Sequence, residues 1–292
     1  MKPPIFDYHS PSSVDEALNL ARRLGADAKF IAGGQSLVPM MNFRLVRPAH
    51  LIDLNGIDGL AYLRVENGEL CIGAMTRHRD VEHSEIVRNG WPLISECMPH
   101  VAHVQIRNRG TLGGSLSHAD PAAELPAVMT ALDAKMVLRS SRGTRTVPAG
   151  GFFVSSLLTV AEPGELLTEV RVPSIAPATG WAFDEFNRRR GDFAIVGAAA
   201  LVRLDKAGTI EWSRLVFTGV GEKPVRSRAV ESALKGQART EAVLQAAAEQ
   251  AGANLSPESD LHASAGYRRD VAKVLALRML TKAVERSRTG VQ

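Results

Sequence analysis

The chain has 292 residues, a length that fits one large domain or two ordinary ones. Apolar residues make up 45% and charged residues 23%, which is the balance of a globular protein and excludes a largely disordered chain. Lys and Arg exceed Asp and Glu by 35 − 31 = 4. So small an excess does not indicate a nucleic-acid-binding protein, which gathers many basic residues on one face.

The chain contains two cysteines, Cys71 and Cys97. An ordinary iron–sulfur cluster takes four thiolates, so this chain cannot bind one alone, and Cys-rich zinc sites and disulfide scaffolds are excluded too. The N-terminal residues 1–4 form no apolar signal segment, and apolar runs such as 195–202 are far shorter than the ~18 residues of a membrane span. We therefore expect a cytoplasmic protein with reduced thiols and no membrane span.

The first part of the chain predicts a mixture of strands and helices. Ser13 and Glu16 form a capping box, and apolar residues then recur at helical spacing until Gly25. Asn67-Gly68 predicts a hairpin turn. Strands are expected at residues 5–8, 28–32, 50–54, 60–65, 69–72, 134–138 and 166–172. Further helices are expected after residue 77, at 92–101 and from Pro121, which suits an early helical position.

A cluster of Pro163, Pro173 and Pro177 with nearby glycines indicates a domain boundary near residue 176. Beyond it we expect a three-stranded meander at 181–187, 196–205 and 209–220, followed by helices at about 227–235, 240–251 and 267–287. The strands and helices do not alternate steadily along the chain. This pattern predicts the α+β class rather than a doubly wound parallel sheet.

Two similar glycine-containing segments, 32–37 and 111–116, are the most informative feature. Paired glycines let backbone N–H groups converge on an anion, and Ser36, Thr111 and Ser115 add hydroxyl donors, so the two segments predict a site that clasps a diphosphate. The alternative is that each is only a tight turn. Neither matches the G-x-G-x-x-G or G-x-x-x-x-G-K-[ST] pattern, so Rossmann and P-loop nucleotide binding lack their usual support.

Other candidate groups have simpler interpretations. His100 and His103 have a spacing that suits a metal, but no convincing further ligand accompanies them. Ser115 and His118 lack the G-x-S-x-G elbow of a serine hydrolase. The run 188–190 of three arginines is either a solvated basic patch or a source of positive charge at a functional site.

The segment 29–37, KFIAGGQSL, resembles the first FAD-binding segment of the flavoprotein (medium) subunits of molybdenum hydroxylases, the carbon monoxide dehydrogenase and xanthine dehydrogenase relatives. The segment 106–116, IRNRGTLGGSL, continuing to 120–126, DPAAELP, resembles the second. The resemblance extends to GELLTEVRVP at 164–173 and RRGDFA at 189–194. It covers essentially the whole chain.

This resemblance implies a PCMH-type FAD-binding region at 1–176, with α+β subdomains at about 1–57 and 58–176, and a smaller C-terminal α+β domain at 177–292. It places the pyrophosphate on the backbone of 32–36 and 111–115, with Asp120 and Glu124 at polar contacts to the ribityl and adenosine portions. It implies no catalytic side chain and no metal ligand in this chain. The implied FAD-binding residues are Lys29, Ile31, Ala32, Gly33, Gly34, Gln35, Ser36, Leu37, Thr111, Gly113, Gly114, Ser115, Asp120, Glu124, Leu167 and Phe193.

Leu167 and Phe193 match an apolar and an aromatic position beside the isoalloxazine. Three positions depart from the pattern: Gln35 stands where some relatives have His, Ser115 where many have Asn, and Glu124 where many have Asp. Because Glu124 is one methylene longer than Asp, the family's FAD contact at this position is the hardest of the three to assign to this chain.

The function implied is that of the FAD subunit of a heterotrimer, assembled as a dimer of heterotrimers. A large partner would carry a molybdenum–pterin centre, a small partner two [2Fe–2S] clusters, and FAD would deliver electrons to an external acceptor. The lack of cluster ligands fits this role. The alternatives are a stand-alone FAD-dependent oxidase or reductase and a non-catalytic assembly protein. The sequence does not indicate which substrate the complex oxidises.

Overall fold

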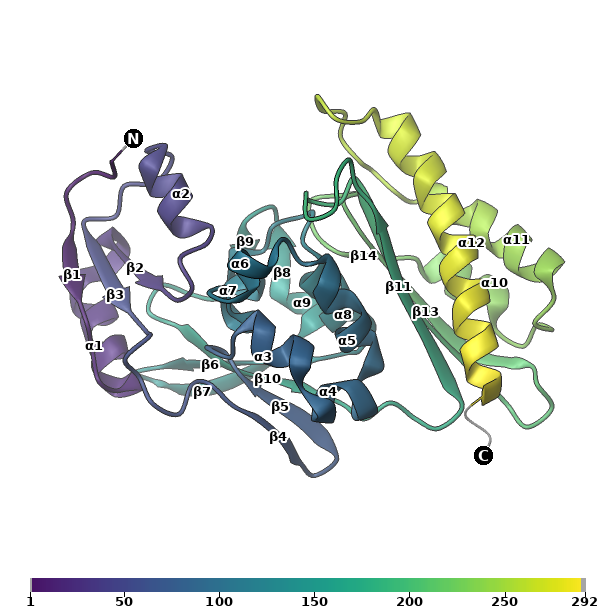
Figure 1. Ribbon diagram of the computed structural model, residues 1–292, viewed down its shortest axis with the longest axis horizontal. Helices are drawn as coiled ribbons and strands as arrows, with labels where there is room; N and C mark the ends of the chain where they lie inside the picture. The colour runs from purple at the N-terminus through teal and green to yellow at the C-terminus, as the bar shows by residue number, and fades with distance from the viewer. Residues whose placement is uncertain (1, 290–292) are drawn as a thin grey trace.

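The computed structural model describes residues 2–289 and begins with a small parallel sheet (Figure 1). Its strand order is β1-β3-β2, with β1 at Asp7–His9, β2 at Ala28–Ile31 and β3 at His50–Asp53. Helix α1 (Val14–Leu24) packs on the sheet, and α2 (Leu37–Asn42) follows β2. The Ser13 hydroxyl caps α1, and Gly25, with φ +64°, ends it, as expected. Glu16 accepts a hydrogen bond from the Ser12 N–H rather than from Ser13.

The second sheet is antiparallel, with the order β4-β5-β10-β6-β7. Asn67 and Gly68, with φ +51° and +78°, form the predicted tight turn between its first two strands. The strands are β4 (Leu63–Glu66), β5 (Glu69–Gly73), β6 (Lys135–Ser140), β7 (Gly143–Pro148) and β10 (Leu166–Val172). The other elements of this region are α3 (His78–His83), α4 (Glu85–Gly90), α5 (Pro92–Cys97), α6 (Val104–Arg107), α7 (Leu112–His118), α8 (Glu124–Ala131), α9 (Ala149–Phe152), β8 (Phe153–Ser155) and β9 (Leu158–Thr159).

Two expectations for this region were wrong in detail. The glycines of the second segment lie in the first turn of α7, where the Thr111 hydroxyl accepts the Gly114 N–H, so the segment is a helix start and not a loop. The helix expected from Pro121 begins at Glu124 instead. Asp120 Oδ1 accepts the Ala122 N–H at 2.9 Å, which holds the intervening residues in a turn.

The third sheet has the order β11-β12-β13-β14. Three long strands, β11 (Thr179–Phe186), β12 (Val196–Leu204) and β13 (Ile210–Thr218), form the expected meander, to which β14 (Val225–Arg226) adds a short fourth strand. Helix α12 (Ala265–Thr289) packs against β11 and β12, and α11 (Glu241–Glu249) lies beside it. Helix α10 (Arg228–Leu234) packs against β13 and α11. Gly180 permits the close packing of α12, because a Cβ there would overlap the Ala283 carbonyl.

Helix α8 lies between the helices of the second region and the third sheet. All eight of its residues are buried, and it packs against α5 on one side and against β12 and β13 on another. The Thr218 hydroxyl, at the end of β13, bonds the carbonyls of Pro121 and Ala123, each at 2.8 Å. The core around α8 includes residues from both sides of position 176. The domain division at that position therefore stays a prediction.

Within residues 2–289, no helix is both long enough and apolar enough to cross a membrane. Cys71 and Cys97 are both buried free thiols.

Candidate functional site

One cavity of about 660 Å³ collects the functional residues expected from the sequence. All sixteen line it, although they come from β2, the turn after it, α7, the start of α8, β10 and the segment between β11 and β12. A volume of several hundred Å³ is typical of a small-molecule or cofactor site.

The first glycine segment presents an open row of backbone donors. Among the hydrogen bonds of residues 2–289, none is donated by the backbone N–H groups of residues 33–37. Gly34 has φ +74°, which turns the chain here, and the Gln35 side chain bonds the Gly33 carbonyl at 3.1 Å. Gly33 is buried and residues 34–37 are partly exposed, so this row of unpaired N–H groups beside the cavity is free to converge on a bound anion.

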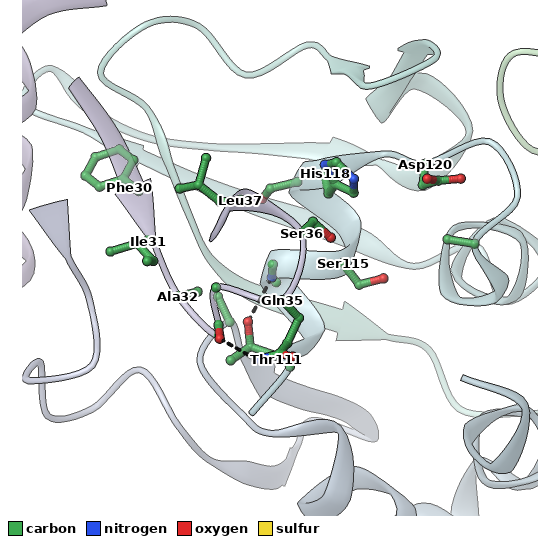
Figure 2. Close-up of a pocket in the computed structure, with 18 of the residues that line it drawn as sticks. Phe30, Ile31, Ala32, Gln35, Ser36, Leu37, Thr111, Ser115, His118 and Asp120 are labelled. Carbon is green, nitrogen blue, oxygen red and sulfur yellow. Dashed lines mark hydrogen bonds between the residues drawn. The ribbon is translucent and has the colours of Figure 1, made fainter. Parts of the chain in front are cut away.

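The second segment contributes differently from what was expected. Its N–H groups are already used: Leu112 donates to the Thr76 carbonyl at 3.0 Å and Gly113 to the Ala74 carbonyl at 2.9 Å. The Ser115 hydroxyl lines the cavity and bonds no described group. In Figure 2 the Ser115 and Ser36 hydroxyls point toward the same side of the two segments. The second segment therefore offers mainly side-chain donors.

The glycines at 33 and 113 let the chain segments approach one another. A Cβ on Gly33 would overlap the Arg109 carbonyl oxygen, and a Cβ on Gly113 would lie 2.5 Å from the Cβ of Ala74. Both distances are too short for real atoms. Gly33 thus sets the spacing between the two segments, and Gly113 seats the second segment against Ala74, just after β5.

The polar end of the cavity contains Asp120 and Glu124. Glu124 is 4% exposed, and burial, with a further contribution from the charge of Glu185, raises its pKa to about 8. It is therefore largely protonated at neutral pH and can donate a hydrogen bond. The described lining residues include one lysine, Lys29. They also include four residues with carboxyl groups: Asp120, Glu124, Glu165 and Asp192. The lining therefore offers mainly neutral hydrogen-bond donors to an anion.

The apolar wall comes from β10 and from the third-sheet region. Leu167 is buried, whereas Phe193 is 61% exposed and lies at the rim. The neighbouring run 188–190 contributes no residue to the lining, and Arg188 lies 3.4 Å from Asp192. The arrangement favours the solvated-patch interpretation of this run.

His78 is a lining residue that the sequence analysis missed. It is 5% exposed, and its two ring nitrogens make no hydrogen bond of good geometry in the described chain, although the Thr111 backbone lies close to the ring. Burial lowers its pKa to about 4, so the ring is neutral and has one N–H to donate. A polar ring left unpaired in a buried wall fits a site completed by a bound group. No sequence pattern around His78 indicates this position. His118 also lines the cavity.

The comparisons with known proteins agree with this geometry. Residues 4–175 match the family described as "FAD binding domain in molybdopterin dehydrogenase", and residues 181–283 match "CO dehydrogenase flavoprotein C-terminal domain". The chain is 45% identical to the 6-hydroxypseudooxynicotine dehydrogenase complex subunit alpha of Paenarthrobacter nicotinovorans, covering 99% of this chain and 97% of that one. It is 42% identical to the carbon monoxide dehydrogenase medium chain of Hydrogenophaga pseudoflava, covering 97% and 98%.

Solved structures give the same result. A chain of carbon monoxide dehydrogenase from Hydrogenophaga pseudoflava superposes with a TM-score of 0.95 at 43% identity, covering 98% of this chain and 99% of that one. A chain of quinoline 2-oxidoreductase from Pseudomonas putida 86 gives 0.93 at 39% identity, covering 98% and 99%. This chain therefore belongs to the family of FAD-binding flavoprotein subunits of the molybdenum hydroxylases, together with the carbon monoxide dehydrogenase medium chains.

Proposed function

We propose that this chain binds FAD in the cavity described above and serves as the electron-transfer subunit of a heterotrimeric molybdenum hydroxylase. Electrons would arrive from [2Fe–2S] clusters on a small partner and leave to an external acceptor, and substrate would be oxidised at a molybdenum–pterin centre on a large partner. The open N–H row of residues 33–37, beside a cavity lined by all sixteen expected residues, carries the proposal.

The residues of the cavity fit FAD from one end to the other. The N–H groups of 33–37 and the Ser115 hydroxyl would hold the pyrophosphate, and Lys29 adds one positive charge. Asp120 and the protonated Glu124 suit hydroxyl and ring-nitrogen groups. Leu167 and Phe193 offer apolar surface to an aromatic ring system.

Bound FAD supplies the redox chemistry, because a flavin accepts electrons singly and releases them in pairs. The chain's own residues bind and orient the cofactor and shield one side of it with apolar surface. No side chain is assigned as a nucleophile or general base. The two cysteines are buried and free, so cluster ligands must come from a partner. Free thiols also agree with a cytoplasmic location.

The test is to tag this chain in its source organism and purify it under mild conditions. We expect it to elute with a large and a small partner, with molybdenum and iron in constant ratio to FAD, as a dimer of heterotrimers by mass. A flavin-containing monomer that oxidises a small substrate by itself would overturn the subunit role and establish the stand-alone oxidoreductase. A chain that elutes in the complex without flavin would overturn the cofactor assignment.

A further inference from the structure

We propose that Asn55 and Arg77 form a side-chain bridge that holds the two FAD-contacting segments in register, which makes them positioning residues for cofactor binding. The inference rests on the proposed function, since it takes FAD as the ligand of the cavity. Neither residue lines that cavity, so both would act through the segments they connect.

The bridge runs from one segment to the other without a break. Asn55 Nδ2 donates to the Ala32 carbonyl at 2.9 Å, and Asn55 Oδ1 accepts from Arg77 Nη2 at 2.6 Å. Arg77 Nη1 then donates to the Arg109 carbonyl. Ala32 begins the first segment, and Arg109 lies two residues before Thr111. A planar guanidinium bonds the two acceptors through two different nitrogens in fixed directions, whereas a lysine would have to reach both from one nitrogen.

The first half of the bridge is itself held in place. Asp53 Oδ1 accepts the Asn55 backbone N–H at 2.9 Å and the Asn55 Nδ2 at 2.5 Å, and Asp53 Oδ2 accepts the Tyr8 hydroxyl. Burial opposes ionisation of Asp53, but the hydrogen bonds from Tyr8 and Asn55 bring its pKa below the ordinary value. Asp53 is thus an ionised acceptor at neutral pH, and it directs the Asn55 amide nitrogen toward Ala32.

The second half of the bridge acts at the contact between the segments. The Arg109 carbonyl oxygen that accepts from Arg77 is the atom against which Gly33 packs. The backbones of Arg77 and Thr111 are also paired in an isolated β-bridge. Arg77 therefore fixes the oxygen that sets the position of Gly33, and Asn55 fixes Ala32 next to it.

The consequence is a preorganised binding surface. The open N–H row belongs to the part of the chain with the first sheet, and Ser115 belongs to the part with the second. A ligand that must touch both binds more weakly when their spacing has to be ordered at the moment of binding. Removing the bridge should weaken FAD binding without removing any group that touches FAD.

The experiment measures FAD dissociation constants of the flavin-depleted full-length chain by fluorescence for Asn55→Ala, Arg77→Lys, Arg77→Met and the double variant Asn55→Ala/Arg77→Met. The matched control is Arg139→Met, which breaks the 2.7 Å ion pair to Asp15, another link between the same two parts of the chain that lies outside the cavity lining. We expect each bridge variant to bind FAD about tenfold more weakly, the double variant to match the singles, and the control to stay within about twofold of the wild type.

A second measurement separates positioning from general damage. Hydrogen exchange of the Leu54 and Val38 N–H groups, which bond the Ile31 and Gly34 carbonyls next to the open row, should speed up in flavin-depleted Asn55→Ala. The thermal midpoint of unfolding should stay within a few degrees of the wild type. If Asn55→Ala binds FAD with wild-type affinity, the bridge proposal is overturned and the proposed function is not. Full affinity in Arg77→Lys with a loss in Arg77→Met overturns it too, since charge rather than bridging would then matter. A wild-type chain that binds no FAD overturns the proposed function itself.

Discussion

Gly33 lies directly against the backbone carbonyl oxygen of Arg109, with no room for a side chain between them. Gly33→Ala must therefore separate the two glycine-containing segments. We expect FAD affinity to fall by roughly 100-fold, which corresponds to about 2.7 kcal/mol. Flavin content after purification and a titration of the depleted chain measure this. Gly150→Ala is the control, because a Cβ there meets no atom within 4 Å. A Gly33→Ala chain that keeps its full flavin content would contradict the prediction.

Glu124→Gln should change how stability depends on pH. The folded-state pKa of about 8 lies above the unfolded value of 4.5, so the native state holds an extra proton between these values. Stability from this group is complete below about pH 4.5 and is lost as pH rises toward 8. Between pH 5 and pH 9, the free energy of unfolding of the wild type should fall by about 4 kcal/mol more than that of the variant.

Urea unfolding of the flavin-free wild type and variant at those two pH values measures this difference in the free energy of unfolding. Exposed Glu258→Gln is the control and should behave as the wild type does. Parallel curves for Glu124→Gln and the wild type would show that Glu124 is ionised in the folded protein.

His78→Leu tests the unpaired histidine. Burial lowers the folded-state pKa to about 4 from 6.5, so the stability associated with a neutral ring is present above pH 6.5 and is lost as pH falls toward 4. Between pH 7.5 and pH 5, the free energy of unfolding of the flavin-free wild type should fall by roughly 2 kcal/mol more than that of His78→Leu. Denaturant midpoints across this range measure it, with exposed His262→Asn as the control. Equal losses in the two proteins would disprove the prediction.

Arg107→Lys should destabilise the cavity wall. Arg107 is buried, bonds both oxygens of Glu82 at 2.7 and 3.2 Å, and also donates to the carbonyls of Val101 and Ala102, both of which line the cavity. A lysine has three N–H groups and cannot make all four bonds, so at least one buried acceptor is left unpaired, at a cost of about 1–3 kcal/mol. Chemical denaturation measures the loss. Arg142→Lys, in an exposed pair with Glu162, should cost under about 1 kcal/mol.

Much of the fold and the site could be predicted because local chemistry and tertiary structure agree. Helix α1 has a Ser13 cap and a Gly25 stop, and both are where the sequence indicates. All sixteen expected site residues line one cavity. The resemblance of whole segments to a known family, rather than periodicity, located those on the later strands.

The features that were missed depend on long-range contacts. Gly113 and Gly114 disfavour a helix, but burial of Leu112 and Leu116 and the Thr111 cap outweigh that preference in α7. Strand β7 is mostly exposed and has no apolar alternation, so nothing in its own residues identifies it. The burial of His78 depends on the packing of Gly110 against it, 32 positions later, which no local pattern encodes.

Helix α8 has no solvent-facing side, so it has no stable place until both the β12–β13 surface and the α5 surface have formed around it. The two regions matched by separate family models should consequently melt in one cooperative transition. A protein cut near residue 176 would leave the apolar residues of α8 uncovered and prone to aggregate. The C-terminal region, though it supplies only the rim of the cavity, thereby holds in place the helix whose first residue, Glu124, lines that cavity.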